Sequence, residues 1–355
     1  MIRILLDIIK RARIPPHLHK TSNHVYTVWQ HLVLLVLRQY ENKSYRRFLD
    51  FLHECTGIQR YLGLSKLPHY TTLQKASERL ESTILHKILS EFVLYVKVRL
   101  MLVGIDATGF GYNQSSYYYT KRARLRRKFV KMSIAADMKH QIVCCIKIRH
   151  RQRHDSVDFV SLLKRTNQII PVSTVLADKG YDSETNHVAA ENLGIASIIP
   201  PRYEDVPIYK TRGCHRKMLK RYGYDRTTYH QRNKTETIFS VIKRMFGDYV
   251  TSRKIVTQNR ELTYRIIAYN CHRIIQNNLL VLVWFLHGHK NIKDVIRDLL
   301  NVDSGANIIV ETARDRSEQI IKDLFNLGVF SLISKPIRFD DVKELMKTLE
   351  SEHKI

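Results

Sequence analysis

Short apolar segments alternate with amphipathic ones between residues 102 and 199, and this alternation constrains the fold more than any other feature. The apolar, strand-like segments are residues 102–107, 131–136, 141–148, 173–177 and 195–199. Residues 155–164 and 183–192 instead repeat their apolar side chains at helical spacing. Strands that alternate with helices usually share one sheet, so the pattern predicts an α/β fold with a sheet flanked by helices.

The region before this sheet, residues 1–98, is predicted to be helical. Residues 25–40, 44–52 and 71–80 are amphipathic at helical spacing, and residues 62–68 form a glycine- and proline-containing turn between two of them. A short, basic, helical region is typical of a DNA-docking module. A helical cap on a larger domain would have the same pattern.

Three acidic residues occupy positions that suit a metal site. Asp106 is expected to end the first strand, Asp178 follows the strand at 173–177, and Glu236 lies in a later amphipathic segment. Strand ends on one edge of an α/β sheet converge, so the two aspartates should lie close together. Carboxylates suit Mg²⁺ or Mn²⁺, and two such ions can stabilise both the attacking and the leaving oxygen of a phosphodiester displacement. Either aspartate alone could equally be a helix cap or a turn residue.

The segment that contains Glu236 is predicted to be one helix over residues 229–246. Its polar members Tyr229, Arg232, Glu236 and Lys243 recur at spacings of three, four and seven, which place side chains on one helical face. A simple surface helix with ion pairs would show the same spacing. The predicted buried face consists of Ile238, Phe239, Val241, Ile242, Met245 and Phe246.

The charge of the chain indicates a polyanionic partner. The net charge is +26, from 59 Lys and Arg against 33 Asp and Glu, and nucleic acid is the simplest partner for such an excess. Residues 288–355 hold 11 Lys and Arg against 12 Asp and Glu, so the surplus lies in residues 1–287. Residues 202–228 are predicted to be a basic insertion that faces DNA. A second cluster mixes tyrosines with cations, as a DNA-tracking surface or a solvated turn would: Lys121, Arg122, Arg124, Arg126 and Arg127.

Other features exclude several classes of protein. The five cysteines show no CxxC spacing, and Cys214-His215 alone is too weak a pattern for a zinc site, so a reducing intracellular compartment is expected. The apolar runs near residues 31–37 and 279–286 are too short to span a membrane. Residues 1–10 lack the pattern of a secretory signal.

Together these motifs resemble the DDE transposases of bacterial and archaeal insertion sequences. Tyr229, Arg232, Glu236 and Lys243 match the family signature Y-x2-R-x3-E-x6-K without a gap, and Asp106 and Asp178 match its two aspartates. Residues 177–181 and 154–163 are similar to further family segments, and residues 44–68 resemble the group called insertion sequence family five. The similarity covers residues 20–280.

The resemblance implies an RNase H-like core and metal-dependent cleavage and joining of DNA strands. Asp106, Asp178 and Glu236 would hold two Mg²⁺ or Mn²⁺ ions, while Arg232 and Lys243 would hold phosphates. Tyr229 would stack on a base or bond a phosphate. His154 and Asp155 could support the metal ligands from behind or cap a helix, and the cap is the favoured interpretation. The implied partner is double-stranded DNA, both the terminal inverted repeats of the element and the target, bound by a homodimer in a prokaryotic cytoplasm, near the nucleoid. A nuclease of the same fold that cleaves without joining, or an inactive DNA-binding protein, would share most of these features.

The segment after residue 287 resembles a different family. Predicted strands at 306–312 and 329–334, with Thr312 and Lys335 at their ends, are similar to the C-terminal half of a response-regulator receiver domain. Leu332 departs from that pattern, which usually has an aromatic residue there, and the phosphoacceptor half is absent. We therefore predict three regions: a helical DNA-binding region at 1–98, a catalytic domain at 99–287, and a partial receiver-like fragment at 288–355. We interpret this fragment as a read-through remnant; the alternative is a genuine α/β appendage of the enzyme.

Overall fold

A computed structural model describes residues 1–18, 25–98, 100–112, 129–151, 153–277, 281–283, 308–312, 326 and 329–334. The chain divides into two compact units, residues 1–273 and 274–355. The N-terminal helices therefore belong to the same compact unit as the sheet, and the division falls before the expected boundary at 287/288. The assignment of separate roles to residues 1–98, 99–287 and 288–355 stays a prediction.

The N-terminal region is helical, as predicted. Its helices are α1 (Ile2–Arg11), α2 (Val28–Tyr40), α3 (Tyr45–Glu54), α4 (Thr56–Tyr61), α5 (Tyr70–Arg79) and α6 (Ser82–Tyr95). A capping box starts α2, because the Thr27 hydroxyl accepts the Gln30 N–H and the Gln30 side chain accepts the Thr27 N–H. Residues 32–37 of α2 are all buried, so this helix lies inside the helical region rather than on its surface.

The first unit contains a six-stranded mixed sheet, which confirms the predicted fold class. Its strands are β1 (Met101–Tyr112), β2 (Phe129–Asp137), β3 (Val143–Arg149), β4 (Val172–Ala177), β5 (Ala196–Ile198) and β6 (Tyr249–Val250). The order is β3-β2-β1-β4-β5, and β6 pairs with the far end of β1. The pairs β1–β2 and β2–β3 are antiparallel, whereas β4 and β6 run parallel to β1 and β5 runs parallel to β4.

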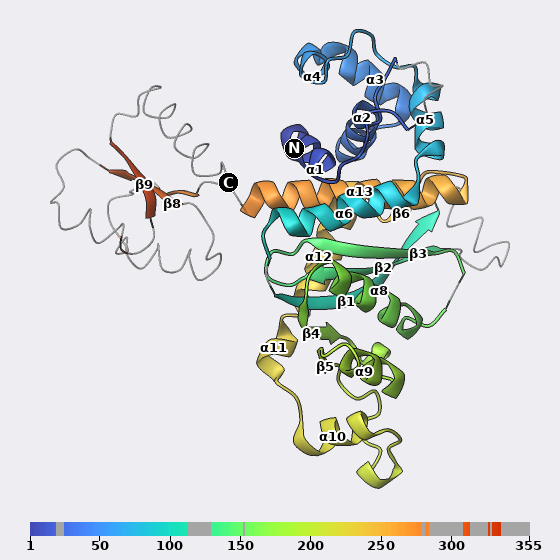
Figure 1. The fold of residues 1–355 in the computed structure, drawn as a ribbon, viewed down its shortest axis with the longest axis vertical. Helices are drawn as coiled ribbons and strands as arrows, with labels where there is room; N and C mark the ends of the chain where they lie inside the picture. Colours follow the sequence, from blue (N-terminus) through green and yellow to red (C-terminus); the bar gives the residue numbers. More distant parts are fainter. Residues whose placement is uncertain are drawn as a thin grey trace, which may run out of the picture. The chain divides into compact units, whose positions relative to one another are not determined.

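Helices cover both faces of this sheet. They are α8 (Ser156–Ile169), α9 (Glu184–Glu191), α12 (Asn233–Phe246) and α13 (Ile255–Asn277). Asp106 pairs with Ile134 across β1 and β2, and the next pair, Ala107 with Ser133, points to the opposite face. Asp158 of α8 bonds to Ser133, whereas Thr235 of α12 bonds to Asp106, so α8 and α12 lie on opposite faces. Helices α6 and α13 run side by side across the sheet (Figure 1).

The predicted basic insertion at residues 202–228 contains short helices. They include the 3₁₀ turn η2 (Ile208–Lys210) and the helices α10 (Cys214–Tyr222) and α11 (Arg226–His230). Arg216 of α10 bonds to the buried carboxylate of Asp182, at 2.9 and 3.0 Å. His215 of α10 bonds to Glu184 of α9 at 2.9 Å. The basic insertion is thus held to the sheet unit by ionic contacts at the start of α10.

The second unit contains a three-stranded parallel sheet. Its strands are β7 (Val281–Val283), β8 (Ile308–Thr312) and β9 (Val329–Ser334), in the order β7-β8-β9. The two predicted strands of this region are confirmed, and Thr312 lies at the end of β8, paired with Ser334. Lys335 and the helices predicted around these strands lie outside the described residues, so the likeness to a receiver domain stays a prediction. Within the described ranges, no helix is long and apolar enough to cross a bilayer.

Candidate active site

Two neighbouring parallel strands bring the predicted aspartates together. Ile105 of β1 pairs with Ala177 of β4, so Asp106 and Asp178 are the next residues on adjacent strands. Asp178 starts the 3₁₀ turn η1 (Lys179–Tyr181), where its Oδ1 accepts the Gly180 N–H at 2.7 Å. Asp106 does not end its strand as predicted. Strand β1 continues to Tyr112 because its second half pairs with the start of β2.

Helix α12 adds the third carboxylate through an arginine bridge. The Nη1 of Arg232 lies 3.3 Å from Oδ2 of Asp106, and its Nη2 lies 2.7 Å from Oε1 of Glu236. The side chains of Arg232 and Asp106 are each 15% exposed, whereas that of Glu236 is 62% exposed. One guanidinium therefore joins a carboxylate of the sheet to a carboxylate of the helix.

Thr235 belongs to the site although the sequence did not single it out. Its buried hydroxyl lies 2.9 Å from Oδ2 of Asp106 and 2.9 Å from the carbonyl oxygen of Arg232, and its one proton can serve one of them at a time. A side chain at Gly104 would lie 2.6 Å from the Thr235 methyl group. The close approach of β1 to α12 thus depends on a glycine. The sequence could have indicated this role, because Thr235 lies one helical turn after Arg232 and therefore on the same face of the helix.

Burial and neighbouring charges shift the pKa values of Asp106 and Arg232. Burial raises the pKa of Asp106, and the nearby carboxylate of Asp178 raises it further. Hydrogen bonds from Ala107 N–H and from Thr235, together with the charge of Arg232, oppose that rise. Burial lowers the pKa of Arg232, but the surrounding acidic groups outweigh it and raise the pKa: Asp106, Tyr229, Glu236 and Asp178.

The expected metal cluster is not assembled among these side chains. In the described part of the chain, no three His, Cys, Asp or Glu side chains are arranged to hold one metal ion. The reason is local, because Arg232 already provides a positive charge between Asp106 and Glu236. The donor chemistry still fits Mg²⁺ or Mn²⁺, since all three acids offer the hard oxygen ligands that these ions prefer.

The signature segment forms two helices instead of the single predicted one. Tyr229 lies in α11, and Arg232 occupies the cap position before α12. Between them the backbone bonds span three residues, from Arg232 N–H to the carbonyl of Tyr229 and from Thr235 N–H to that of Arg232. This tighter turn separates α11 from α12, and Tyr229 still lies close enough to Arg232 for the two side chains to shift each other's pKa. The predicted buried face is largely confirmed, with Val241 and Met245 half-buried and the rest buried.

The remaining residues predicted to bind DNA have mixed outcomes. The Tyr229 ring packs edge to face on Tyr224, with centroids 5.4 Å apart. The Nζ of Lys243 lies 5.6 Å from the ring centroid of Phe110 in β1, and Lys243 makes no ion pair with any described residue. Its charge therefore stays available. Lys121, Arg122, Arg124, Arg126 and Arg127 lie outside the described residues.

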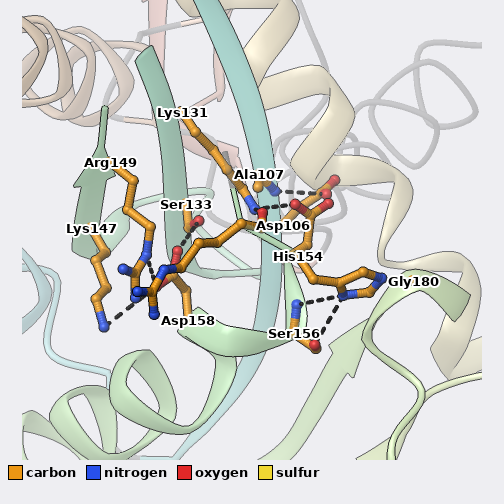
Figure 2. Close-up of polar contacts among 12 residues, drawn as sticks. Asp106, Ala107, Lys131, Ser133, Lys147, Arg149, His154, Ser156, Asp158 and Gly180 are labelled. Atoms are coloured by element: carbon orange, nitrogen blue, oxygen red, sulfur yellow. Dashed lines mark hydrogen bonds and ion pairs between the residues drawn. The ribbon is translucent and has the colours of Figure 1, made fainter. Parts of the chain in front are cut away.

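A second polar network lies under α8 (Figure 2). Asp155 occupies the cap position of α8 but makes no capping bond with its side chain, which pairs with Lys131 instead. His154 accepts the Ser156 N–H at 3.4 Å and lies 2.9 Å from the Ser156 hydroxyl. The capping role expected of this pair thus falls to His154 and not to Asp155.

Comparison with known proteins finds a family model that matches the sheet-containing part of the chain. Residues 101–271 match the family model of the transposase DDE domain. The matched range begins with β1 and ends within α13, so it includes Asp106, Asp178, Glu236 and the arginine that bridges two of them. The transposase DDE domain match supports a nucleic-acid-processing enzyme of the DDE transposase type. It does not distinguish insertion sequence family five from other groups.

Two solved structures show weak overall similarity. One is the simian T-cell lymphotropic virus intasome in complex with PP2A regulatory subunit B56 gamma, at 14% identity, covering 55% of this chain and 53% of that chain, with a TM-score of 0.28. The other is the Drosophila P element transposase strand transfer complex, at 11% identity, covering 99% and 86%, with a TM-score of 0.29. This chain spans about half of the first of these structures, and scores this low carry no further conclusion.

Proposed function

We propose that the protein is a DDE transposase that cleaves DNA at the ends of a mobile element and joins the 3′ ends to target DNA. The observation that carries this proposal is the Arg232 guanidinium that pairs with both Asp106 and Glu236, with Asp178 following the strand beside Asp106, inside the segment that matches the transposase DDE domain. Three acids from β1, the end of β4 and α12 are what a two-metal phosphoryl-transfer site requires.

The proposed cofactor is a pair of Mg²⁺ or Mn²⁺ ions held by these three carboxylates. When bound, the ions would activate the attacking hydroxyl group and stabilise the leaving oxygen. Thr235 fixes the rotamer of Asp106 by bonding its Oδ2. Arg232 holds Asp106 and Glu236 near each other, which lowers the repulsion between the acids.

The proposed partner is double-stranded DNA, both the terminal inverted repeats and the target, bound by a homodimer in a prokaryotic cytoplasm. The support is the positive charge of residues 1–287, which includes Lys243 on α12 and the basic residues of the insertion at 202–228. Phosphate contacts from such cations would position the duplex without reading its sequence.

The first test replaces each acid by its amide, as Asp106→Asn, Asp178→Asn and Glu236→Gln. We expect the rate at which each variant nicks end-containing duplex DNA in Mn²⁺ to fall by more than about 100-fold. This exceeds the usual effect of removing a residue that only hydrogen-bonds a metal ligand. DNA binding should be retained or tighter, because each change removes a negative charge without removing a phosphate contact. Band-shift titration and gel-based nicking measure the two effects.

Glu54→Gln is the matched control, because it removes one exposed carboxylate on α3, away from the site. It should cleave like the wild type. Full cleavage by any of the three amide variants would refute the assignment. A strand-transfer reaction on pre-cut ends then separates a transposase from a nuclease that does not join, and DNA binding without cleavage by the wild type would indicate an inactive binding protein.

A further inference from the structure

A second cation-rich site lies at the β3 edge of the sheet, two strands away from β1 and Asp106. It is a cavity of about 190 Å³ between α6, β3, α8 and α13, more than one water molecule needs. Its polar lining comes from all four elements: Ser82, His86, Lys147, Arg165, Asn259, Arg260 and Thr263. The lining contains no Asp or Glu.

The two arginines of this cavity are the least compensated of its cations. Arg260 donates to the Ser82 hydroxyl at 2.7 Å, and its Nε is buried without a hydrogen-bond partner among the described residues. Arg165 is exposed and makes no ion pair or hydrogen bond with any residue that the structure describes. Lys147 differs, since it lies 3.3 Å from Asp158 and donates to Ser161 at 2.8 Å. A buried guanidinium N–H without a partner is costly, so the Nε of Arg260 calls for a hydrogen-bond acceptor in the cavity, and an anion would also match its charge.

The pKa of His86 is lowered by burial and by the two arginines that line the cavity. Burial lowers its pKa to about 4, and the charges of Arg165 and Arg260 contribute to that shift. The arginine charges lower the pKa because they disfavour the positively charged form of the imidazole. The imidazole is therefore neutral at pH 7 and can donate a hydrogen bond to a bound anion.

The N-terminus of α6 lies at the same cavity. Ser82 is the first residue of this 14-residue helix, and the preceding Glu81 makes no side-chain capping bond. The carboxylate of Glu81 instead accepts the hydroxyl of Thr83 at 3.0 Å. The first N–H groups of α6 and its positive dipole end thus lie beside Arg260.

We propose that this cavity binds a phosphate group. A planar guanidinium forms paired hydrogen bonds to phosphate oxygens, and here two of them meet a helix N-terminus and a neutral histidine without an opposing carboxylate in the lining. The phosphate belongs either to the backbone of bound DNA or to a free anion. The DNA source rests on the proposed function, whereas the free-anion source does not.

The test uses the full-length, metal-free protein and inorganic phosphate as the probe. Calorimetric titration should show binding to the wild type, weakened about tenfold or more in Arg260→Gln and in Arg165→Gln, because each loses a charge-assisted hydrogen bond. Lys164→Gln is the matched control, since Lys164 is exposed on α8 and does not line the cavity. Saturating phosphate should also raise the pKa of His86, measured by proton NMR.

A parallel titration with a short DNA duplex identifies the source of the phosphate. If DNA supplies it, both arginine variants lower the salt dependence of duplex binding by about one unit, and Lys164→Gln does not. If a free anion fills the cavity, duplex binding stays unchanged while phosphate binding is lost. Unchanged phosphate and duplex binding in both variants, with unchanged melting temperatures, would overturn the proposal. Arg165→Gln keeps the test decisive if Arg260→Gln unfolds, and a failed cleavage assay does not affect either titration.

Discussion

Asp158 is a fully buried carboxylate that attaches α8 to the sheet. It accepts from Arg149 Nε at 2.7 Å and from the Ser133 hydroxyl at 3.0 Å, and Lys147 lies 3.3 Å away. Burial alone would raise the pKa of Asp158, but these partners lower it below its ordinary value. Asp158 is thus a buried carboxylate whose charge is balanced by ion pairs and hydrogen bonds.

Asp158→Asn should destabilise the protein by about 3 kcal/mol, because it leaves Arg149 and Lys147 beside a neutral amide. The stabilisation is present above the unfolded pKa, near 3.9, and is lost as the pH falls through the lowered folded pKa. Urea unfolding at pH 7 should therefore separate variant from wild type, and the gap should close in acid. Asp50→Asn, an exposed change on α3, should have no effect at either pH. Equal stability of the Asp158 variant at pH 7 would contradict this account.

At the scale of elements, the contact between β1 and α12 sets the geometry of the site. A Cβ atom at Gly104 would lie 2.6 Å from the Thr235 methyl group and 2.7 Å from the thioether sulfur of Met138. Real Cβ atoms essentially never come this close, so any larger residue must displace the Thr235 and Met138 side chains or the helix α12 that carries Thr235. Asp106 would then lose its bond to Thr235 and its contact with Arg232.

Gly104→Ala should cost about 1–3 kcal/mol of stability and lower cleavage more than the stability loss explains. Thermal melting and nicking at a temperature where both proteins are folded separate these effects. Gly57→Ala is the matched control, because nothing lies within 4 Å of a Cβ there and alanine favours the α4 helix. Wild-type melting and cleavage by Gly104→Ala would show that β1 and α12 are not packed as described.

At the scale of the whole molecule, the first unit contains every residue of the proposed active site. Helix α13 completes this unit: its Asn270 side chain bonds both the N–H and the carbonyl of Val143 in the edge strand β3, and Tyr264 and Tyr269 are buried. The segment after residue 287 carries only −1 of the net charge, from its 11 basic and 12 acidic residues. It is therefore not expected to contribute to folding of the first unit or to DNA binding.

Truncation after residue 287 should leave melting temperature, DNA affinity and cleavage within about twofold of the full chain, since long-range charge effects on binding are set by residues 1–287. Truncation after residue 254 removes α13 and should give no folded protein. If the protein truncated after residue 287 fails to fold or to cleave DNA, the C-terminal segment is part of the enzyme and not a remnant.

The sequence by itself determined the local elements and which acidic residues are candidates for the site. An element with one buried face places its apolar residues at a regular spacing, and that spacing can be read from the sequence. It predicted the strand ending before Asp178, the buried face of α12 with Ile238 and Phe246, and the strands β8 and β9. Only the tertiary structure decided which side chains meet. Arg232 joins Asp106 across 126 residues, and Arg260 meets Ser82 across 178. Such pairs leave no periodic trace, since they depend on strand order and on how closely two elements approach.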